Sequence, residues 1–292
     1  MASQLILHEV TRQQIEQFMA NPAHAALIAG PDGIGKASLA EHVAATLLGL
    51  ETAKLASYPH FLRVEPDGAS ISIEKIRDLQ RFLQLKTIGT HPLRRALIIE
   101  HANALTTEAQ NAYLKLLEEP PADTLMLLTV SSPRALLPTI LSRVQTITVH
   151  PPAEDQLQPL LQASGKDETT LRQAYFLSGG LPGLLAALLG GDETHPLLAS
   201  VSTAKEILQK QPFERLGLVE TLSKQKGSAG AVLDALERIA QAGLDGASTK
   251  HDDARLKQWH NIRKQTLSAR QALSRSGNTK LTLSNLFLHL PG

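Results

Sequence analysis

The sequence predicts an α/β domain built on a parallel sheet, followed by an all-helical region. Short apolar runs that stop at glycine or polar residues alternate with amphipathic helical segments, as in parallel sheets covered on both faces. A glycine-rich loop joins the first apolar run to the first long helix that follows it. After Pro151-Pro152 the strand-like runs cease and only helical periodicity continues.

The expected strands and helices alternate along the first 150 residues. Each helix spaces its apolar residues three or four positions apart, whereas each strand is a short continuous apolar run. In the last of these helices, Thr107 and Gln110 have the spacing of a capping box, and Pro120-Pro121 ends the helix. The expected strands are residues 24–30, 95–100, 124–132 and 145–150, and the expected helices are 11–20, 36–50, 70–86 and 105–121.

The remainder of the chain is expected to be helical. Residues 153–190 predict short helices broken at "SGGLPG" (178–183), and a further series of helices follows from about residue 200. We therefore divide the chain into three domains, over residues 1–150, 151–198 and 199–292.

Composition excludes several classes of site. The chain of 292 residues has no cysteine, which excludes disulfides, a catalytic thiol and any thiolate zinc site. No apolar stretch reaches about 18 residues and no signal peptide is evident, so we expect a cytoplasmic protein without a membrane partner. The net charge of +1 neither favours nor excludes a polyanionic partner.

The loop "GPDGIGKAS" (30–38) has the G-x-x-x-x-G-K pattern of a phosphate-binding loop. Its strand-loop-helix context is the one that such a loop requires, because backbone N–H groups and the helix N-terminus then surround the phosphates. Ala37 stands where a Ser or Thr hydroxyl holds Mg²⁺, and the next hydroxyl, on Ser38, points about 100° away on a helix. The pattern leaves ATP binding open and makes a magnesium site doubtful. The residues expected at the phosphates are Gly30, Gly33, Gly35, Lys36 and Ser38.

A second candidate feature lies at the end of the strand at 95–100. In P-loop ATPases this position supplies an acid for the metal and, one residue later, a base that activates water. Glu100 suits the first role, whereas His101 differs from a carboxylate in shape and charge. Thr129, at the end of the next strand, is a candidate polar sensor. The alternative interpretation is a polar pair facing solvent.

Two longer segments are more specific. "EAQNAYLKLLEEPP" (108–121) and "SSPRALLPTILSR" (131–143) resemble the AAA+ clamp-loader subunits of bacterial DNA polymerase III, most of all those of the delta-prime type. "GGLPGLLAALL" and the closing "NTKLTLSNLFLHL" extend the resemblance over nearly the whole chain.

The resemblance implies a RecA-like P-loop domain, a small helical lid and a helical collar. It also implies partners: ATPase subunits of the gamma or tau type and a delta subunit in a five-membered ring, the sliding clamp, and primer–template DNA reached through the complex. Ser142-Arg143 matches the family's Ser-Arg pair, which assigns Arg143 as an arginine finger acting on a neighbouring subunit.

The chain departs from the family pattern at four places. Ala37 and His101 alter the metal and base positions, and Leu184 stands where family ATPases carry an arginine in the lid. The four-cysteine zinc module expected around 50–65 is missing, and His60 alone cannot build a zinc site. The subunit's own site has thus lost its metal ligand, its base and its lid arginine, whereas Arg143 is intact. This combination implies a subunit that hydrolyses little ATP itself. An active gamma-type ATPase using Ser38 and Glu100, or an unrelated P-loop protein such as a small-molecule kinase, stays open.

The basic stretch at 249–280 has two interpretations. It is either a DNA contact or a solvated or intersubunit face. Trp259 within it is expected to pack in the core rather than to stack on a base.

Overall fold

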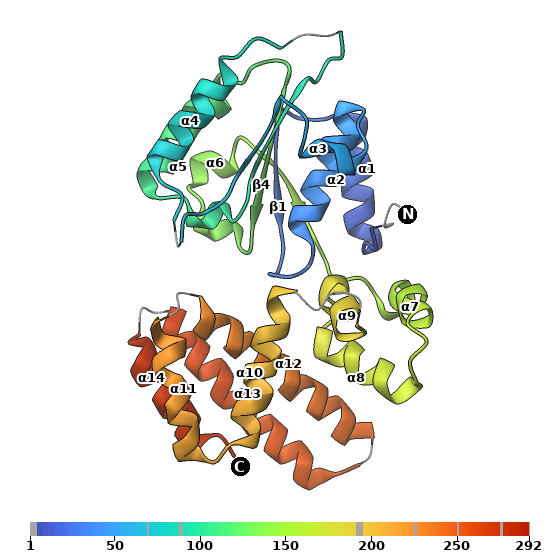
Figure 1. Cartoon of the computed structure of the whole chain (residues 1–292), viewed down its shortest axis with the longest axis vertical. Coiled ribbons are helices and arrows are strands. Elements are labelled where there is room, and N and C mark those ends of the chain that lie inside the picture. The colour runs from blue at the N-terminus through green and yellow to red at the C-terminus, as the bar shows by residue number, and fades with distance from the viewer. Residues whose placement is uncertain are drawn as a thin grey trace. The chain divides into compact units, whose positions relative to one another are not determined.

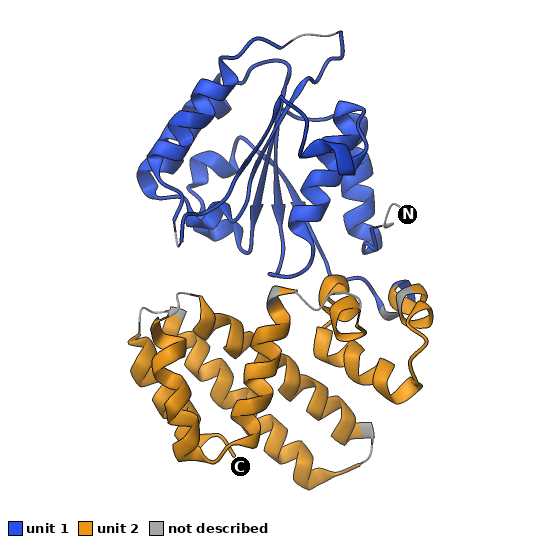
Figure 2. Ribbon diagram, in the orientation of Figure 1, with its two compact units in different colours: residues 1–156 blue, residues 157–292 orange. Residues whose placement is uncertain are grey.

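A computed structural model describes residues 5–68, 70–87, 90–190, 195–224, 227–249, 251–274 and 277–291 (Figure 1). The chain divides into two compact units, residues 1–156 and 157–292 (Figure 2). Each unit is described by itself. The boundary expected near residue 198 stays a prediction.

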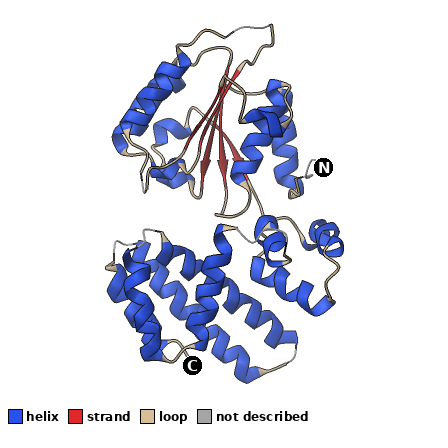
Figure 3. Ribbon diagram, viewed as in Figure 1, coloured by secondary structure: helices blue, strands red, loops and turns tan. Residues whose placement is uncertain are grey.

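The first unit contains a five-stranded parallel sheet in the order β2-β3-β4-β1-β5 (Figure 3). The four predicted strands are present, which confirms the α/β class. A fifth strand, β2, lies at the sheet edge and was not predicted because only Val64 in it is buried. The strands are β1 (Ala25–Ala29), β2 (Phe61–Val64), β3 (Arg95–Ile99), β4 (Thr124–Val130) and β5 (Gln145–Thr148).

Helices cover both faces of this sheet, with α1, α2 and α3 on one side and α4, α5 and α6 on the other (Figure 1). The core under the second group joins Leu27 of β1 to Leu79 of α4 and Tyr113 of α5, all fully buried. The helical segments are α1 (Glu9–Ala20), α2 (Lys36–Leu48), α3 (Thr52–Leu55), α4 (Ile73–Leu83), α5 (Thr107–Glu118) and α6 (Pro138–Leu141), with 3-10 turns η1 (Ala102–Ala104) and η2 (Pro133–Ala135).

The predicted capping box of α5 is wrong by one residue. Thr106 caps the helix, its Oγ1 accepting a hydrogen bond from the N–H of Ala109 at 3.2 Å. Gln110 is free for another role, and its side chain accepts from the N–H of Leu137 at 2.8 Å while donating to the carbonyl of Leu105 at 3.3 Å. This amide ties α5 to the segment that begins α6.

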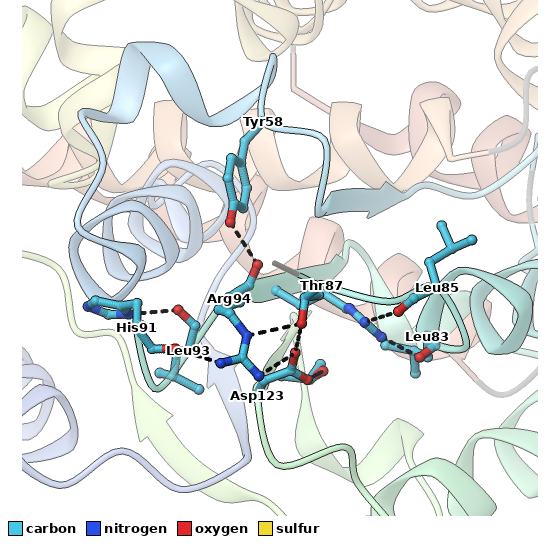
Figure 4. A network of polar contacts seen from close by, with 10 residues as sticks. Tyr58, Leu83, Leu85, Thr87, His91, Leu93, Arg94 and Asp123 are labelled. Atoms are coloured by element: carbon cyan, nitrogen blue, oxygen red, sulfur yellow. Dashed lines mark hydrogen bonds and ion pairs between the residues drawn. The ribbon is translucent and has the colours of Figure 1, made fainter. Parts of the chain in front are cut away.

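Polar contacts fasten the amino ends of β3 and β4. Figure 4 shows Arg94 between Thr87 and Asp123, with Nε donating to Thr87 at 3.0 Å and Nη2 lying 3.4 Å from Asp123. The buried Arg95 donates to the carbonyls of Leu83 and Leu85, which ties the end of α4 to the start of β3. Because the strands are parallel, this network lies at the amino edge of the sheet, where the strands begin. The glycine-rich loop lies at the opposite, carboxyl edge, where the strands end.

The second unit is helical throughout its described residues, as predicted. On α13, half-buried Trp259 packs against α12 at Gly243, where a Cβ would lie 2.3 Å from two indole carbons. Trp259 therefore packs against a neighbouring helix, but it is not part of the buried core in which it was predicted to lie. The helices are α7 (Glu154–Ala163), α8 (Glu168–Ser178), α9 (Pro182–Leu188), α10 (Pro196–Gln209), α11 (Pro212–Lys224), α12 (Ser228–Thr249), α13 (Asp253–Ser274) and α14 (Thr279–His289).

Part of the basic stretch is neutralised within this unit. Arg255 pairs with Asp252 at 3.4 Å, and Arg270 pairs with Asp234 and Glu237 at 3.2 and 2.8 Å. Lys250 and Arg275 lie outside the described residues. DNA contact by this stretch stays a prediction. Over the part of the chain that the structure describes, no helix is both long and apolar enough to cross a membrane.

Arg215 on α11 is fully buried and holds three helices together. Its guanidinium donates to the carbonyls of Ile207 on α10 at 2.7 Å, and of Leu290 and Pro291 after α14 at 2.7 and 3.1 Å. Carbonyls at helix ends lack intrahelical partners and carry partial negative charge, so they suit a buried cation.

We predict that Arg215→Lys lowers the free energy of unfolding by about 3 kcal/mol, because an ammonium cannot reach all of these buried carbonyls at once. Urea unfolding followed by circular dichroism measures this change. Arg255→Lys, at an exposed ion pair, is the matched control and is expected to cost well under about 1 kcal/mol. Equal midpoints for the two variants would contradict the anchoring role.

Candidate functional site

The glycine-rich loop connects the carboxyl end of β1 to α2. The N–H of Gly30 donates to the carbonyl of Val130 at 3.1 Å, which anchors the loop to β4. A Cβ at Gly30 would lie 2.8 Å from the carbonyl oxygen of Val149, so no larger residue fits there. Gly35 caps α2 with φ of 92°, and Gly33 also has positive φ, 82°. The backbone shape predicted from the motif is present.

Lys36 begins α2, and its side chain is turned back onto the loop. The residue is only 6% exposed. Its Nζ donates to the carbonyls of Gly30 at 2.7 Å and Pro31 at 2.9 Å, and to Asp32 Oδ1 at 3.1 Å. An ammonium has three N–H donors, and these three oxygens engage all of them.

The positions after the lysine place no hydroxyl beside it in the first turn of α2. Ala37 is half-buried and has no polar side chain, whereas Ser38 is exposed. Binding of a cofactor by Ser38 stays a prediction.

Glu100 directly follows β3 and is 7% exposed. Its Oε1 lies 2.5 Å from Nη2 of Arg63. The two groups form an ion pair, but the angles between them are not those of a hydrogen bond. Arg63 also lies 2.5 Å from Glu41 on α2 and 2.8 Å from Glu65. Burial raises the pKa of Glu100 above its ordinary value of 4.5, although the positive charge of Arg63 opposes this shift.

His101 has a left-handed backbone, with φ of 47° and ψ of 49°, which is uncommon for a residue other than glycine. Its N–H donates to Oγ1 of Thr129 at 3.1 Å, and Thr129 is buried in β4. The side chain of His101 is exposed. The structure therefore brings Glu100, His101 and Thr129 together at the carboxyl edge of the sheet, as the strand ends predicted.

Arg143 lies away from this group. It precedes β5, which pairs in parallel with β1 so that Gln145 lies beside Ala26 and Thr148 beside Ala29. Arg143 is therefore at the amino edge of the sheet, roughly 20 Å along the strand direction from the loop at about 3.3 Å per residue. Its Nη2 donates to Glu118 of α5 at 3.0 Å, and the side chain is 36% exposed.

Two residues of this region were missed in the sequence. Asp32 was treated as a variable letter of the loop, and Arg63 lies in the unpredicted strand β2. A charged residue inside a phosphate-loop motif was a usable signal for Asp32. No local pattern marked Arg63, because its partners come from three separate segments. Within the described residues, no group of three or more His, Cys, Asp or Glu side chains is placed to hold a metal ion.

Comparisons with known proteins agree with this architecture. The family model described as "DNA polymerase III, delta subunit" matches residues 7–153. DNA polymerase III subunit delta' of Pseudomonas aeruginosa is 36% identical over 221 residues, which cover 69% of this chain and 66% of that protein. The chain belongs to the delta-prime family of DNA polymerase III subunits. This confirms the predicted resemblance.

Other relatives are matched over shorter segments. The delta-prime subunit of Bacillus subtilis is 34% identical over 142 residues, covering 44% of this chain and 43% of that protein. DNA polymerase III subunit tau/gamma of Haemophilus influenzae is 34% identical over 149 residues, covering 46% of this chain and 21% of that one. Each match spans less than two thirds of the relative's length.

We predict that the free energy of unfolding of the Glu100→Gln variant increases relative to that of the wild type as the pH rises from about 4.5 toward neutrality. A raised carboxyl pKa in the folded state favours the protonated form, so its contribution to stability is present at low pH and lost as the pH rises through that pKa. Glutamine keeps the uncharged shape at every pH. Urea midpoints measured between pH 4 and 8 follow the difference.

The matched control is Asp78→Asn, which removes an exposed carboxylate from its ion pair with Arg81 on α4, whereas Glu65 is unsuitable because its charge helps to raise the pKa of Glu100. Asp78→Asn is expected to leave the pH profile parallel to that of the wild type. A parallel profile for Glu100→Gln would contradict the prediction.

Proposed function

We propose that this chain is a clamp-loader subunit that hydrolyses little or no ATP itself and supplies Arg143 to the nucleotide site of a neighbouring subunit. The observation that carries the proposal is the position of Arg143 at the sheet edge opposite its own glycine-rich loop. A partly exposed guanidinium so placed cannot reach its own loop, but it is accessible to another molecule. An arginine supplied in trans stabilises charge that develops during phosphoryl transfer.

The surroundings of Arg143 suit this role. Its backbone N–H donates to the carbonyl of Ile140, and Nη1 donates to the carbonyl of Thr139 at 3.0 Å. The ion pair with Glu118 is exposed and therefore contributes little stability, so a phosphate can replace Glu118 at modest cost. The side chain is held near one orientation without being locked in it.

The partners follow from the same proposal. They are ATPase subunits of the gamma or tau type and a delta subunit in a five-membered ring in the cytoplasm. The ring acts on the sliding clamp and on primer–template DNA. The names of the three relatives described above, each a subunit of DNA polymerase III, support this assignment.

A second candidate function is ATP hydrolysis by the chain itself. The glycine backbone of the loop and Lys36, at the lysine position of the phosphate-loop pattern, favour it. Turnover of ATP by the isolated protein that disappears in Lys36→Ala would support this candidate and contradict a subunit without hydrolysis of its own.

We predict that Arg143→Ala in a reconstituted complex slows hydrolysis at the one neighbouring site by about 100-fold or more, since arginine fingers contribute factors of about 10³–10⁵. Single-turnover hydrolysis and clamp loading onto primed DNA are the measurements. Complex assembly, followed by size-exclusion chromatography, is expected to be unchanged.

Arg134→Ala is the matched control, because Arg134 is an exposed arginine in η2 on the segment leading to Arg143. It is expected to retain wild-type rates. Normal hydrolysis and loading with Arg143→Ala would show that the trans role is wrong.

A further inference from the structure

The glycine-rich loop carries its own counter-ion for Lys36. Asp32 belongs to the loop itself, four residues before the lysine, and its carboxylate lies 3.1 Å from Nζ. The carboxylate side chain is 56% exposed, whereas the ammonium side chain is only 6% exposed. The charge of Lys36 is therefore balanced by a neighbouring residue at the mouth of the loop, where a phosphate oxygen would otherwise approach.

The acid at the end of β3 likewise has a counter-ion from the chain. Arg63 reaches Glu100 from the adjacent strand β2 and binds Glu41 and Glu65 with its other nitrogens. These carboxylates come from α2, from the residue after β2 and from the residue after β3. A single cation thus joins three segments around the position where a P-loop ATPase holds its metal.

These residues do not fit a magnesium nucleotide. The loop lysine has no free N–H donor, the position after it has no hydroxyl, and the buried acid is already paired. One guanidinium also faces three carboxylates, so this cluster has a net negative charge that opposes a triphosphate. Lys36 and Glu100, the charged side chains that would bind the nucleotide and its metal, are both engaged by the protein.

We propose that Asp32 and Arg63 are internal replacements for the phosphate and the metal ion, and that they keep the loop closed and ordered without a nucleotide. The loop then serves as a structural joint between β1, β4 and α2, and Arg63 ties β2 to α2 and to the residue after β3. A buried ammonium and a buried carboxylate would each be costly alone, and both are paired here without any ligand. This inference concerns the isolated chain and does not depend on the role of Arg143.

The first test is Asp32→Asn, which keeps the size of the side chain and removes its charge. Titration with a fluorescent ATP analogue, followed by anisotropy, is expected to show binding about tenfold tighter than that of the wild type, since Lys36 regains an unbalanced charge. Lys36→Met in the Asp32→Asn background is expected to abolish the gain. Asp78→Asn, which removes the exposed partner of Arg81 on α4, is the matched control and is expected to change nothing.

The second test adds Arg63→Gln to Asp32→Asn, which frees Glu100 and its neighbouring carboxylates. Binding of the analogue is then expected to become stronger with Mg²⁺ than without it. If the glutamine variant does not fold, Arg63→Lys in the same Asp32→Asn background takes its place. Lysine keeps a positive charge beside Glu100, so nucleotide binding by this variant is expected not to depend on Mg²⁺. Thermal melting of every variant establishes that the chain is folded.

The two parts of the inference fail separately. The role of Asp32 is overturned if the wild type binds the magnesium nucleotide tightly. It is also overturned if the Asp32→Asn variant binds the nucleotide no better than the wild type. A folded double variant without magnesium dependence, or a folded Arg63→Lys variant that shows it, overturns the role of Arg63. Neither result bears on hydrolysis by a neighbouring subunit.

Discussion

The polarity of the parallel sheet determines where each functional group can act. All five strands run in the same direction. The strands therefore all begin at one side of the sheet, the amino edge, and all end at the other, the carboxyl edge. The glycine-rich loop, Glu100 and Thr129 follow or end strands and share the carboxyl edge. Arg143 precedes β5 and lies at the other edge. Changes in the loop can therefore accumulate without disturbing the arginine, because the sheet separates the two.

Two buried cations show different solutions to the same electrostatic problem. Among the described residues, the partners of the Arg215 guanidinium are all backbone carbonyls, whose partial negative charges stabilise it. Lys36 has two carbonyls and also a full negative charge from Asp32. The first arrangement fastens helices to one another. The second leaves less positive charge on Lys36 to attract an anion, in line with the structural role that we propose for this lysine.

Much of the first unit was predictable because buried strands and amphipathic helices leave strong local patterns. The runs around Leu27, Leu97 and Leu127 are apolar throughout, and their burial on both faces is complete. β2 has no such run, since Arg63 is exposed between half-buried Leu62 and buried Val64. The cap of α5 was misplaced because only Thr107 has a glutamine three residues later, whereas Thr106, which caps the helix, is followed there by Ala109.

Most residues of the candidate site could be predicted from the sequence, but Asp32 and Arg63 were missed, and so was the pairing of the charged side chains. Strand ends and a glycine motif are local, so Glu100, His101, Thr129 and Lys36 could be named from the sequence. The pairing of Arg63 with Glu41, Glu65 and Glu100 depends on three segments meeting in space. Asp32 and Lys36 are four residues apart, yet nothing in that spacing tells whether the lysine turns toward the loop or away from it.

On the proposal that Arg63 takes the place of the metal ion, the departures at Ala37 and His101 have a common physical explanation. A metal ion beside Glu100 would have to displace Arg63, which two further carboxylates hold. Without a metal, a hydroxyl at position 37 has nothing to coordinate and a base at position 101 has no polarised water to activate. The left-handed backbone of His101 is instead stabilised by its bond to Thr129, a contact that needs no particular side chain at 101. Side-chain constraints at both positions therefore weaken together, while Gly30 remains required by the close approach of Val149. On the proposal that Asp32 and Arg63 replace the ligands, the loop keeps its backbone where packing requires it, and its side chains change where only a ligand would constrain them.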